Sequence, residues 1–385
     1  MLPQNAVFVP WEKGRWRLRC IGIFHETHDV KTFHFECADD DIDEKTLFLH
    51  KPGQFITLQL QSGARPISRS YTIASPPSRP MTLALTIKRD PGGLVSRFMH
   101  DHLSVGDVVS AVGPAGTFNS ADIAPRSKLL MLSGGSGITP VMSMLRSIYD
   151  TAGGAPDVIF LHSARTPADI IFRNELVWME AERPNIAVFH ICEERAERGM
   201  PAGLLDAQIL ENHAPDFLER TILTCGPKPY MNAVNAILKD ANFDFGHYYE
   251  ESFGDSSLRA NPPGAAPENI KSAAHPAPCS EIREERSPDA DALESTVKSS
   301  NAVTFVKSDQ RIYYRHGESI LEIATRAGIA ISTNCQMGLC GTCKMRLLSG
   351  EVSMDEDEGL ADEDRGRGFI LTCCGRPKGL VAIDL

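Results

Sequence analysis

The sequence predicts a multidomain protein of mixed β and α/β class, in which an antiparallel β-barrel precedes a doubly wound parallel α/β domain and a small C-terminal domain. Three observations support this prediction. The 385 residues exceed what one hydrophobic core usually serves, so two or three domains are expected. The hydrophobic pattern changes near residue 123, from short alternating runs to strands that alternate with helices. Residues 255–300 contain six prolines and no Phe, Tyr or Trp, which predicts a linker.

Residues 1–122 are predicted to form the barrel. Residues 55–60 (Phe-Ile-Thr-Leu-Gln-Leu) and 83–88 (Leu-Ala-Leu-Thr-Ile-Lys) are short runs with apolar residues at alternate positions, as in half-buried strands. Proline and glycine separate these runs and favour turns between antiparallel neighbours. The segment Gly-Pro-Ala-Gly-Thr-Phe at 113–118 is expected to close this domain.

Residues 123–254 are predicted to form the α/β domain, because strand and helix patterns alternate along them. Such alternation is typical of a parallel sheet with helices on both faces. The predicted strands are 129–132, 158–161, 186–191 and 221–224, and the predicted helices are 141–149, a segment beginning at Ile170, and 230–240.

Residues 301–385 follow the linker and have the size of one compact domain. Strands are predicted at 303–307 and 310–314. A helix is predicted to begin near Ser319, because apolar residues recur at helical spacing over 320–327. The rest of this domain contains a group of cysteines.

Four of these cysteines have the ligand spacing of a plant-type 2Fe-2S cluster. Cys335, Cys340 and Cys343 form C-x4-C-x2-C, and Cys373 follows after 29 residues. Intervening glycines let the loop wrap around an inorganic core. A structural zinc site usually pairs two C-x2-C knuckles, whereas this chain has one knuckle and a distant cysteine. We therefore predict a one-electron centre, with Cys373 as the fourth ligand and the adjacent Cys374 as a spare.

The sequence Arg-Ser-Tyr-Thr at 69–72 is suited to a flavin nucleotide. Arg69 can neutralise a pyrophosphate, Tyr71 can lie against a flat ring, and the hydroxyl of Thr72 can bond a ring nitrogen. Ser70 belongs to the same strand. The alternative is an ordinary surface arginine beside a strand tyrosine.

A glycine pair before a predicted helix is a candidate phosphate cradle. Lys88 precedes Gly-Gly-Leu-Val-Ser at 92–96, and a helix is predicted over 97–103. Glycines let backbone N–H groups approach an anion, and a helix N-terminus favours negative charge.

A second glycine-rich loop, Ser-Gly-Gly-Ser-Gly-Ile-Thr-Pro at 133–140, follows a predicted strand and opens a predicted helix. Pro140 stands at a first-turn position, where no N–H is required. The loop is not the G-x-G-x-x-G fingerprint of dinucleotide-binding domains, and an ordinary strand-to-helix connection is the alternative. Further on, Ser163 and Arg165 could bind a 2′-phosphate, whereas Asp169 could disfavour one. These residues leave the choice between NADH and NADPH open; the resemblance of the whole chain, given below, favours NADH.

In this order, the segments resemble the ferredoxin-NADP reductase superfamily. The resemblance rests on the three segments above together with Thr-Cys-Gly-Pro at 224–227 and Tyr-Glu-Glu-Ser-Phe-Gly at 249–254. It implies an NAD(P)-binding domain and a flavin-binding barrel that holds FAD more readily than FMN. The candidate cofactor-binding residues are Arg69, Ser70, Tyr71, Thr72, Lys88, Gly93, Val95, Ser96, Gly134, Gly135, Gly137, Thr139, Pro140, Ser163, Arg165, Cys225, Gly226, Pro227 and Phe253.

Three of these residues are the catalytic candidates that the resemblance implies. Thr72 would lie where hydride reaches the flavin, Cys225 would line the nicotinamide pocket, and Phe253 would lie by the flavin ring. For Phe253, core packing is the alternative. Electrons would pass from NADH (or NADPH) through FAD to the 2Fe-2S cluster and then to an acceptor protein.

From Trp16 to Leu385 the chain is similar to the reductase components of Rieske-type N-demethylating monooxygenases, including those for glycine betaine. This resemblance implies that residues 301–385 form a β-grasp ferredoxin-like 2Fe-2S domain and that a Rieske-type oxygenase component accepts the electrons. Reductases of hybrid-cluster proteins and of other soluble acceptors share most of the motifs and are the alternative.

Composition and charge exclude several other classes. A formal net charge of −11 argues against nucleic acid or an anionic membrane as partner. The N-terminus lacks an export signal and no run approaches 18 apolar residues, so we expect a cytoplasmic protein. Self-contained oxygenation is disfavoured, since no 2-His-1-carboxylate or Rieske Cys-His pattern is present. Residues 351–364 contain eight acidic and no basic residues, which suits either a docking patch or a solvated loop.

Overall fold

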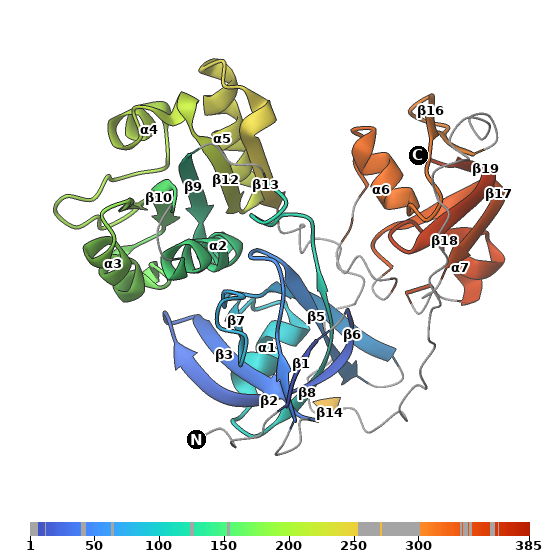
Figure 1. Ribbon diagram of the computed structural model, residues 1–385, viewed down its shortest axis with the longest axis horizontal. Coiled ribbons are helices and arrows are strands. Elements are labelled where there is room, and N and C mark those ends of the chain that lie inside the picture. The colour runs from blue at the N-terminus through green and yellow to red at the C-terminus, as the bar shows by residue number, and fades with distance from the viewer. Residues whose placement is uncertain are drawn as a thin grey trace. The chain divides into compact units, whose positions relative to one another are not determined.

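The computed structural model divides into two compact units, Met1–Ser272 and Ala273–Leu385 (Figure 1). The residues that the structure describes are 7–11, 13–39, 44–62, 65–123, 127–151, 155–252, 270–271, 301–331, 333, 338, 341–354, 359–360 and 362–385. The predicted linker lies outside them, apart from Ile270 and Lys271.

The first part of the N-terminal unit is a curled antiparallel sheet, which confirms the predicted barrel. Its strands are hydrogen-bonded in the order β14-β5-β8-β2-β3-β7, with β6 paired to β5. A short parallel pair, β1 and β4, forms a separate small sheet. The bounds are β1 (Val7–Pro10), β2 (Gly14–His25), β3 (Val30–Cys37), β4 (Glu44–Leu47), β5 (Phe55–Ser62), β6 (Arg65–Thr72), β7 (Leu83–Lys88), β8 (Val108–Ala115) and β14 (Ile270–Lys271).

The barrel encloses an apolar core and carries one helix. Phe33, Phe35 and Leu58, which alternate with polar neighbours along their strands, are fully buried in this core. Helix α1 (Leu94–Asp101) begins three residues before the predicted start at residue 97, because Gly93 is extended and acts as the N-cap. The helix therefore starts directly after the glycine pair.

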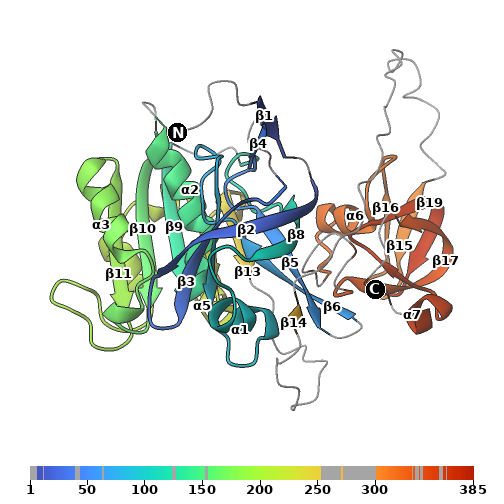
Figure 2. The same ribbon diagram turned by 90° about the horizontal axis from the view of Figure 1, so that it is seen from below.

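The second part of the N-terminal unit is a parallel sheet in the order β11-β10-β9-β12-β13. Helices α2 and α3 pack on one face, and α4 and α5 on the other, which confirms the doubly wound prediction. Figure 2 shows β9, β10 and β11 side by side. The bounds are β9 (Lys128–Gly134), α2 (Ile138–Asp150), β10 (Asp157–Ala164), α3 (Arg173–Glu182), β11 (Ile186–Cys192), α4 (Ala207–His213), β12 (Thr221–Gly226), α5 (Lys228–Asp240) and β13 (Tyr248–Ser252).

Three elements of this domain differ from the sequence prediction. Helix α3 begins at Arg173 rather than Ile170, because Phe172 adopts a left-handed conformation with φ 58° that no helix can continue through. Helix α4 has only seven residues, too few for a clear period. Strand β13 carries two consecutive glutamates, Glu250 and Glu251, which interrupt the apolar pattern of a strand.

The C-terminal unit is a five-stranded mixed sheet in the order β16-β15-β19-β17-β18, with α6 packed on it in the β-grasp arrangement. Helix α6 begins after Ser319 as predicted. Ser319 and Glu322 form a reciprocal capping box, in which each side chain accepts a hydrogen bond from the backbone N–H of the other. The bounds are β15 (Ala302–Phe305), β16 (Gln310–Tyr313), α6 (Ile320–Arg326), β17 (Lys344–Met354), α7 (Asp362–Gly366), β18 (Phe369–Leu371) and β19 (Gly375–Ile383).

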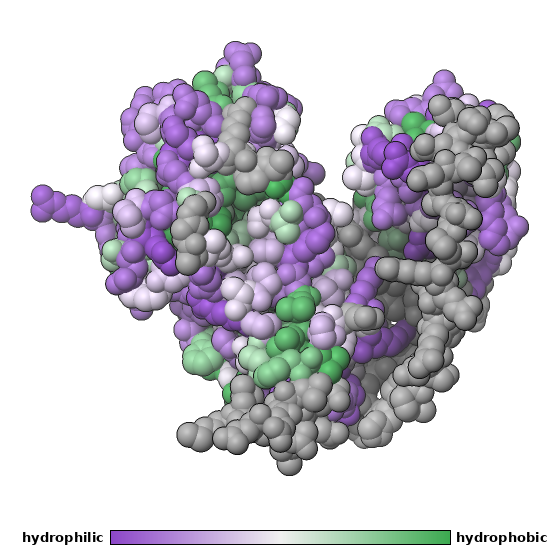
Figure 3. All heavy atoms as spheres, in the orientation of Figure 1, coloured by the Kyte–Doolittle hydropathy of each residue, from purple (hydrophilic) through white to green (hydrophobic). Residues whose placement is uncertain are grey.

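The surface is mainly hydrophilic on the face shown in Figure 3, with apolar atoms gathered over the barrel near β1. Phe8, Val9 and Leu49 are exposed there. Within the described ranges, no helix has the length and apolar character needed to cross a membrane.

Candidate cofactor sites

Strand β6 presents the predicted flavin residues on two faces. Arg69 and Tyr71 alternate with Ser70 and Thr72 along the strand. The hydroxyl of Thr72 is buried and has no hydrogen-bond partner in the described part of the chain, although buried hydroxyls are normally paired. Such a group fits a flavin ring whose nitrogen or oxygen completes the bond. Residues at this strand end can therefore hold FAD.

The other three side chains of this segment are placed differently. Arg69 is exposed, and its guanidinium donates to the carbonyl of Ser68 at 3.2 Å. The hydroxyl of Ser70 lies 2.9 Å from that of Thr57 on β5. Burial raises the pKa of Tyr71, so its phenol stays neutral. Arg69 is thus the side chain with a charge available to a phosphate.

Helix α1 packs against β6 and places the candidate phosphate cradle beside it. A Cβ on Gly93 would lie 2.5 Å from the hydroxyl of Ser96, which accepts a hydrogen bond from the Asp90 N–H at 3.2 Å. Val95 is buried in the barrel core. A side chain at position 93 would therefore displace the Ser96 hydroxyl from the Asp90 N–H.

Lys88 is placed away from this arrangement. Its ammonium lies 3.2 Å from a carboxylate oxygen of Asp29, on the hairpin between β2 and β3. The structure brings Gly93, Val95 and Ser96 together and pairs Lys88 with the hairpin.

The two predicted nicotinamide segments meet at the carboxyl ends of β9 and β12. Ser133 on β9 is the register partner of Cys225 on β12. A Cβ on Gly137 would lie 2.3 Å from the carbonyl oxygen of Cys225, so only glycine permits this approach. The strand order reverses between β9 and β12, and ligands of open α/β sheets bind at such a switch point. Gly134, Gly135, Gly137, Cys225, Gly226 and Pro227 surround it.

Two further residues of the loop are structural. The hydroxyl of Thr139 donates to the carbonyl of Ser136 at 3.1 Å, and Pro140 stands in the first turn of α2. Both help to start the helix directly after the glycines.

Tyr230 on α5 is a residue that the sequence analysis did not single out. Its ring packs over both Gly134 and Gly226, where a Cβ would lie 3.0 Å and 2.6 Å from ring carbons. Its hydroxyl and that of Ser163 are buried, and neither has a hydrogen-bond partner among the residues described. Burial raises the pKa of Tyr230, so its phenol stays neutral. The glycines make room for this ring, a requirement that loop sequence alone does not reveal.

A row of polar side chains crosses all five strands on the α2–α3 face. His190, His162, Ser133, Cys225 and Glu251 are successive register partners from β11 to β13. Burial lowers the pKa of His162 to about 3 and that of His190 to about 4, and raises that of Glu251 to about 8. Ser133 and His162 are hydrogen-bonded at 2.8 Å. This row is uncharged at neutral pH, and only Cys225 in it was predicted.

In the segment of Ser163 and Arg165, the acidic residue Asp169 is hydrogen-bonded to neighbouring residues of the protein. Asp169 accepts hydrogen bonds from the N–H and the hydroxyl of Thr166 at 3.1 and 2.7 Å. Together the two residues form a capping box for the short turn Pro167–Asp169. The other carboxylate oxygen of Asp169 lies 3.3 Å from a ring nitrogen of His28. Arg165 is exposed. The choice between NADH and NADPH stays a prediction.

Two of the four predicted cluster ligands lie close together in the C-terminal unit. The sulfurs of Cys343 and Cys373 are 3.1 Å apart, and the Gly338 N–H donates to the Cys373 sulfur at 3.3 Å. The Cys374 thiol instead faces the carbonyl of Leu371 at 3.7 Å. Backbone N–H groups aimed at sulfur suit an iron–sulfur centre. Cys335, Cys340 and Phe253 lie outside the described residues.

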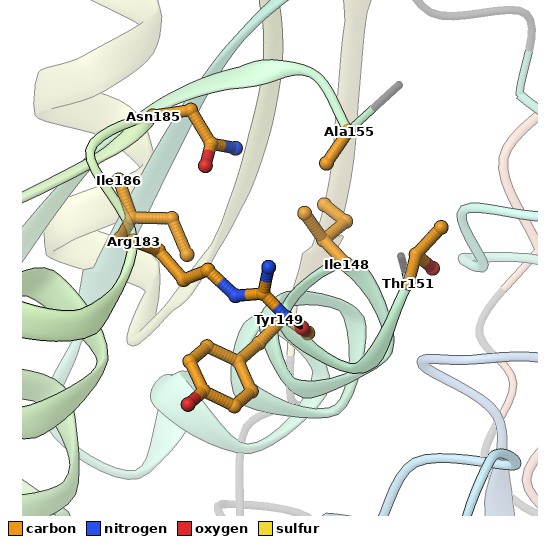
Figure 4. A pocket seen from close by; sticks show the side chains of 7 residues that line it. All are labelled: Ile148, Tyr149, Thr151, Ala155, Arg183, Asn185 and Ile186. Carbon is orange, nitrogen blue, oxygen red and sulfur yellow. Dashed lines mark hydrogen bonds between the residues drawn. The ribbon is translucent and has the colours of Figure 1, made fainter. Parts of the chain in front are cut away.

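A cavity of about 250 Å³ lies elsewhere on the α/β domain, as Figure 4 shows. It is lined by the end of α2 and by residues just before β10 and β11, which places it at the amino ends of the strands. The guanidinium of Arg183 lies 4.9 Å from the centre of the Tyr149 ring beside it. The cavity is therefore at the opposite sheet edge from the nicotinamide segments.

Three domain families match successive parts of the chain. Residues 20–120 match the oxidoreductase FAD-binding domain, 131–236 the oxidoreductase NAD-binding domain, and 304–378 the 2Fe-2S iron-sulfur cluster binding domain. These matches confirm the predicted cofactors.

Two relatives align with the chain over nearly their whole length. The chain is 42% identical to the glycine betaine monooxygenase reductase subunit of Pseudomonas aeruginosa, with 97% of this chain and 96% of that protein covered. It is 34% identical to the stachydrine N-demethylase reductase subunit of Rhizobium meliloti, covering 95% and 96%. Phthalate dioxygenase reductase shares its fold, with a TM-score of 0.54 at 22% identity over 97% of this chain and 98% of the other.

Proposed function

Because the chain belongs to the family of monooxygenase reductase subunits that combine FAD-binding, NAD-binding and 2Fe-2S domains, we propose that it reduces the oxygenase component of a Rieske-type N-demethylating system. The substrate we propose for that system is glycine betaine or a related quaternary amine. The observation that carries the proposal is 42% identity over 97% of the chain to a glycine betaine monooxygenase reductase subunit. The stachydrine N-demethylase relative supports the substrate class.

The three cofactors divide the chemistry of this oxidoreductase. Bound FAD would supply the exchange between the two-electron chemistry of the nicotinamide and the one-electron chemistry of the 2Fe-2S cluster, from which electrons would reach the oxygenase. The protein supplies orientation and a dry environment for these transfers. Its residues would act at three places: strand β6 of the barrel, the switch point between β9 and β12, and the cysteines of the C-terminal unit.

On β6 of the barrel, Thr72 would direct its unpaired hydroxyl to the flavin ring, and Arg69 would neutralise the pyrophosphate. At the switch point, the loop of Gly134 to Gly137 would hold the nicotinamide nucleotide against Cys225. The buried Oε2 of Glu251, which has no hydrogen-bond partner within the described structure, can hold a proton near the reacting rings. Burial of the Cys225 thiol raises its pKa well above the usual range, so the thiol stays neutral and adds no charge.

At the exit, Cys335, Cys340, Cys343 and Cys373 would ligate the cluster. The position of Cys373, 3.1 Å from Cys343 and bonded by the Gly338 N–H, supports it as the fourth ligand over Cys374.

Reconstitution with an oxygenase tests the proposal. The FAD- and cluster-loaded protein is combined with the oxygenase component of a glycine betaine monooxygenase, and NADH-dependent formaldehyde release is measured with glycine betaine and, separately, with stachydrine. We expect release to require all three of NADH, reductase and oxygenase, and to be faster with NADH than with NADPH.

Omission of the oxygenase gives the control, in which an artificial one-electron acceptor should still be reduced. Rapid reduction of that acceptor without any reduction of the oxygenase would contradict the proposed partner. Reduction of a hybrid-cluster protein under the same conditions would support the alternative acceptor.

A further inference from the structure

The residues just after β6, here called the flavin strand, are hydrogen-bonded to helix α2. Helix α2 begins directly after Gly134–Gly137, here called the nicotinamide loop. β6 ends at Thr72, and the next residues turn beside β7, where the Ala74 N–H donates to the Ala84 carbonyl at 2.8 Å. The Ser75 hydroxyl accepts from the Ala84 N–H at 3.0 Å. These bonds leave the Ala74 carbonyl for contacts outside the barrel sheet, while the Ser75 carbonyl also lies 3.0 Å from Nε2 of His50 in the barrel.

Two side chains of α2 take up these carbonyls. The hydroxyl of Ser143 donates to the Ser75 carbonyl at 2.9 Å, and a guanidinium nitrogen of Arg146 donates to the Ala74 carbonyl at 2.7 Å. Both side chains are buried, and Arg146 is only 8% exposed. Residues three apart lie on one face of a helix, so both bonds come from a single stripe of α2.

Arg146 is itself held in one orientation. Its guanidinium donates to both carboxylate oxygens of Glu175 on α3, at 2.8 and 2.5 Å. The same group lies 4.5 Å from the centre of the Phe172 ring. Glu26 of the barrel is close enough for Arg146 to lower its pKa in part, although burial raises that pKa overall. A planar guanidinium can make this bidentate bond and still reach the Ala74 carbonyl, whereas an ammonium cannot.

We propose that Arg146 and Ser143 are positioning residues for hydride transfer, because they set the distance between the flavin strand and the nicotinamide loop. This inference rests on the proposed function. Helix α2 starts at Ile138, directly after Gly137, and rises about 12 Å from there to Arg146. Helix α2 thus follows the nicotinamide loop directly and, through Arg146, is hydrogen-bonded to the backbone of Ala74, two residues beyond Thr72.

The chemistry makes such a fixed distance important. Hydride moves only between rings in near-contact, and a misplacement of about 1 Å can cost roughly a hundredfold in rate. The alternative is that Arg146 only adds stability to the contact between the two domains. The two roles predict different results. Loss of positioning lowers the rate of flavin reduction at saturating NADH, whereas loss of stability alone leaves that rate unchanged.

The chain offers a matched control in Arg79. Its guanidinium also makes a bidentate bond, to Asp150 at 2.9 and 2.8 Å. It joins the same two domains, but at the last residue of α2 and on the surface. Arg146→Lys removes the bond to the Ala74 carbonyl and the bidentate bond to Glu175 that orients it, whereas Arg79→Lys removes a bidentate bond between the same two domains at the exposed end of α2.

The test is stopped-flow reduction of the FAD-loaded full chain by NADH. For Arg146→Lys we expect the limiting rate to fall about tenfold or more and the NADH dissociation constant to change less than about twofold. The long-wavelength charge-transfer absorbance between nicotinamide and flavin should also fall. Arg79→Lys should keep the wild-type rate and absorbance, even if it lowers the melting temperature as much as Arg146→Lys does.

Ser143→Ala gives a second, smaller change that leaves the Arg146 bonds in place, and it should shift rate and absorbance in the same direction. If Arg146→Lys folds poorly, Ser143→Ala decides the question. Wild-type rate and absorbance in these variants would overturn the positioning role. Failure of the wild-type protein to bleach with NADH or NADPH would instead overturn the proposed function.

Discussion

At the scale of single residues, Glu251 has the most strongly raised pKa among the carboxyl groups that the structure describes. It lies beside Cys225 across β12 and β13, and desolvation raises its pKa from 4.5 to about 8. Between these two values the folded protein holds a proton that the unfolded chain has lost. The free energy of unfolding therefore falls as the pH rises from 4.5 to 8, by up to about 5 kcal/mol if the whole shift is realised.

Replacement by a group that cannot ionise should remove this pH dependence. We expect Glu251→Gln to equal the wild type in stability at pH 5 and to exceed it at pH 9. Thermal unfolding of the FAD-loaded protein at pH 5, 7 and 9 measures the difference.

Glu250→Gln is the matched control for this change. The Glu250 carboxylate is exposed and accepts a hydrogen bond from the Tyr248 hydroxyl at 2.7 Å, so its replacement should keep the wild-type slope. Parallel stability curves for wild type and Glu251→Gln would show that the buried proton is absent.

The residues that sequence reasoning recovered differ in kind from those that it missed. Cys343 and Cys373 could be singled out because ligand spacing is visible in the sequence itself, and the structure places their sulfurs 3.1 Å apart; their role as cluster ligands stays a prediction. Glu251, His162 and Tyr230 were not, because their environment arises only when strands far apart in the chain become neighbours. The partner of Lys88 was unpredictable for the same reason, since Asp29 lies on another hairpin.

At the scale of elements, the loop between β9 and α2 depends on one close approach. Gly137 has an ordinary helical φ of −64°, so its backbone would accept alanine. Its Cβ, however, would lie 2.3 Å from the Cys225 carbonyl oxygen, and backbone cannot move aside cheaply. The constraint is therefore packing between two strand ends.

We predict that Gly137→Ala costs about 1–3 kcal/mol of stability and weakens NADH binding at least tenfold, because β9 and β12 must separate. Denaturant unfolding and NADH titration measure the two effects. Gly203→Ala is the control: its φ of 107° strains alanine, but nothing lies within 4 Å of the new Cβ. It should lose stability and keep NADH affinity, and equal affinity loss in both variants would contradict the packing argument.

Elements with a strong period were predictable and short or charged ones were not. Strands β9 and β10 and helix α2 have long apolar patterns, and the sequence places each to within a few residues. The late start of α3 depends on the left-handed backbone conformation of Phe172, which the residue type does not predict. The seven residues of α4 and the two glutamates of β13 carry too little pattern.

At the scale of the whole molecule, the two compact units separate two kinds of transfer. The N-terminal unit contains the FAD- and NAD-binding domains, and the C-terminal unit contains the 2Fe-2S domain. A change in the second unit should therefore leave the chemistry of the first intact. This separation gives a test of the electron exit.

We predict that Cys373→Ser abolishes reduction of the oxygenase and spares NADH-driven bleaching of the flavin. Stopped-flow absorbance follows both steps, and cluster absorbance reports the iron–sulfur content. Cys374→Ser is the matched control and should retain both steps. The reverse result would move the fourth ligand by one residue while leaving the order of transfers unchanged.

The packing of Tyr230 over two glycines has a consequence for how this site can change by substitution. Gly134 and Gly226 come from strands β9 and β12, yet both are small for the sake of one ring. Alanine at either glycine should therefore be harmful beside tyrosine and far less so beside a small residue at 230. The effects of substitutions at the three positions are therefore non-additive. A single substitution should appear more destabilising than the same substitution made together with a smaller residue at position 230.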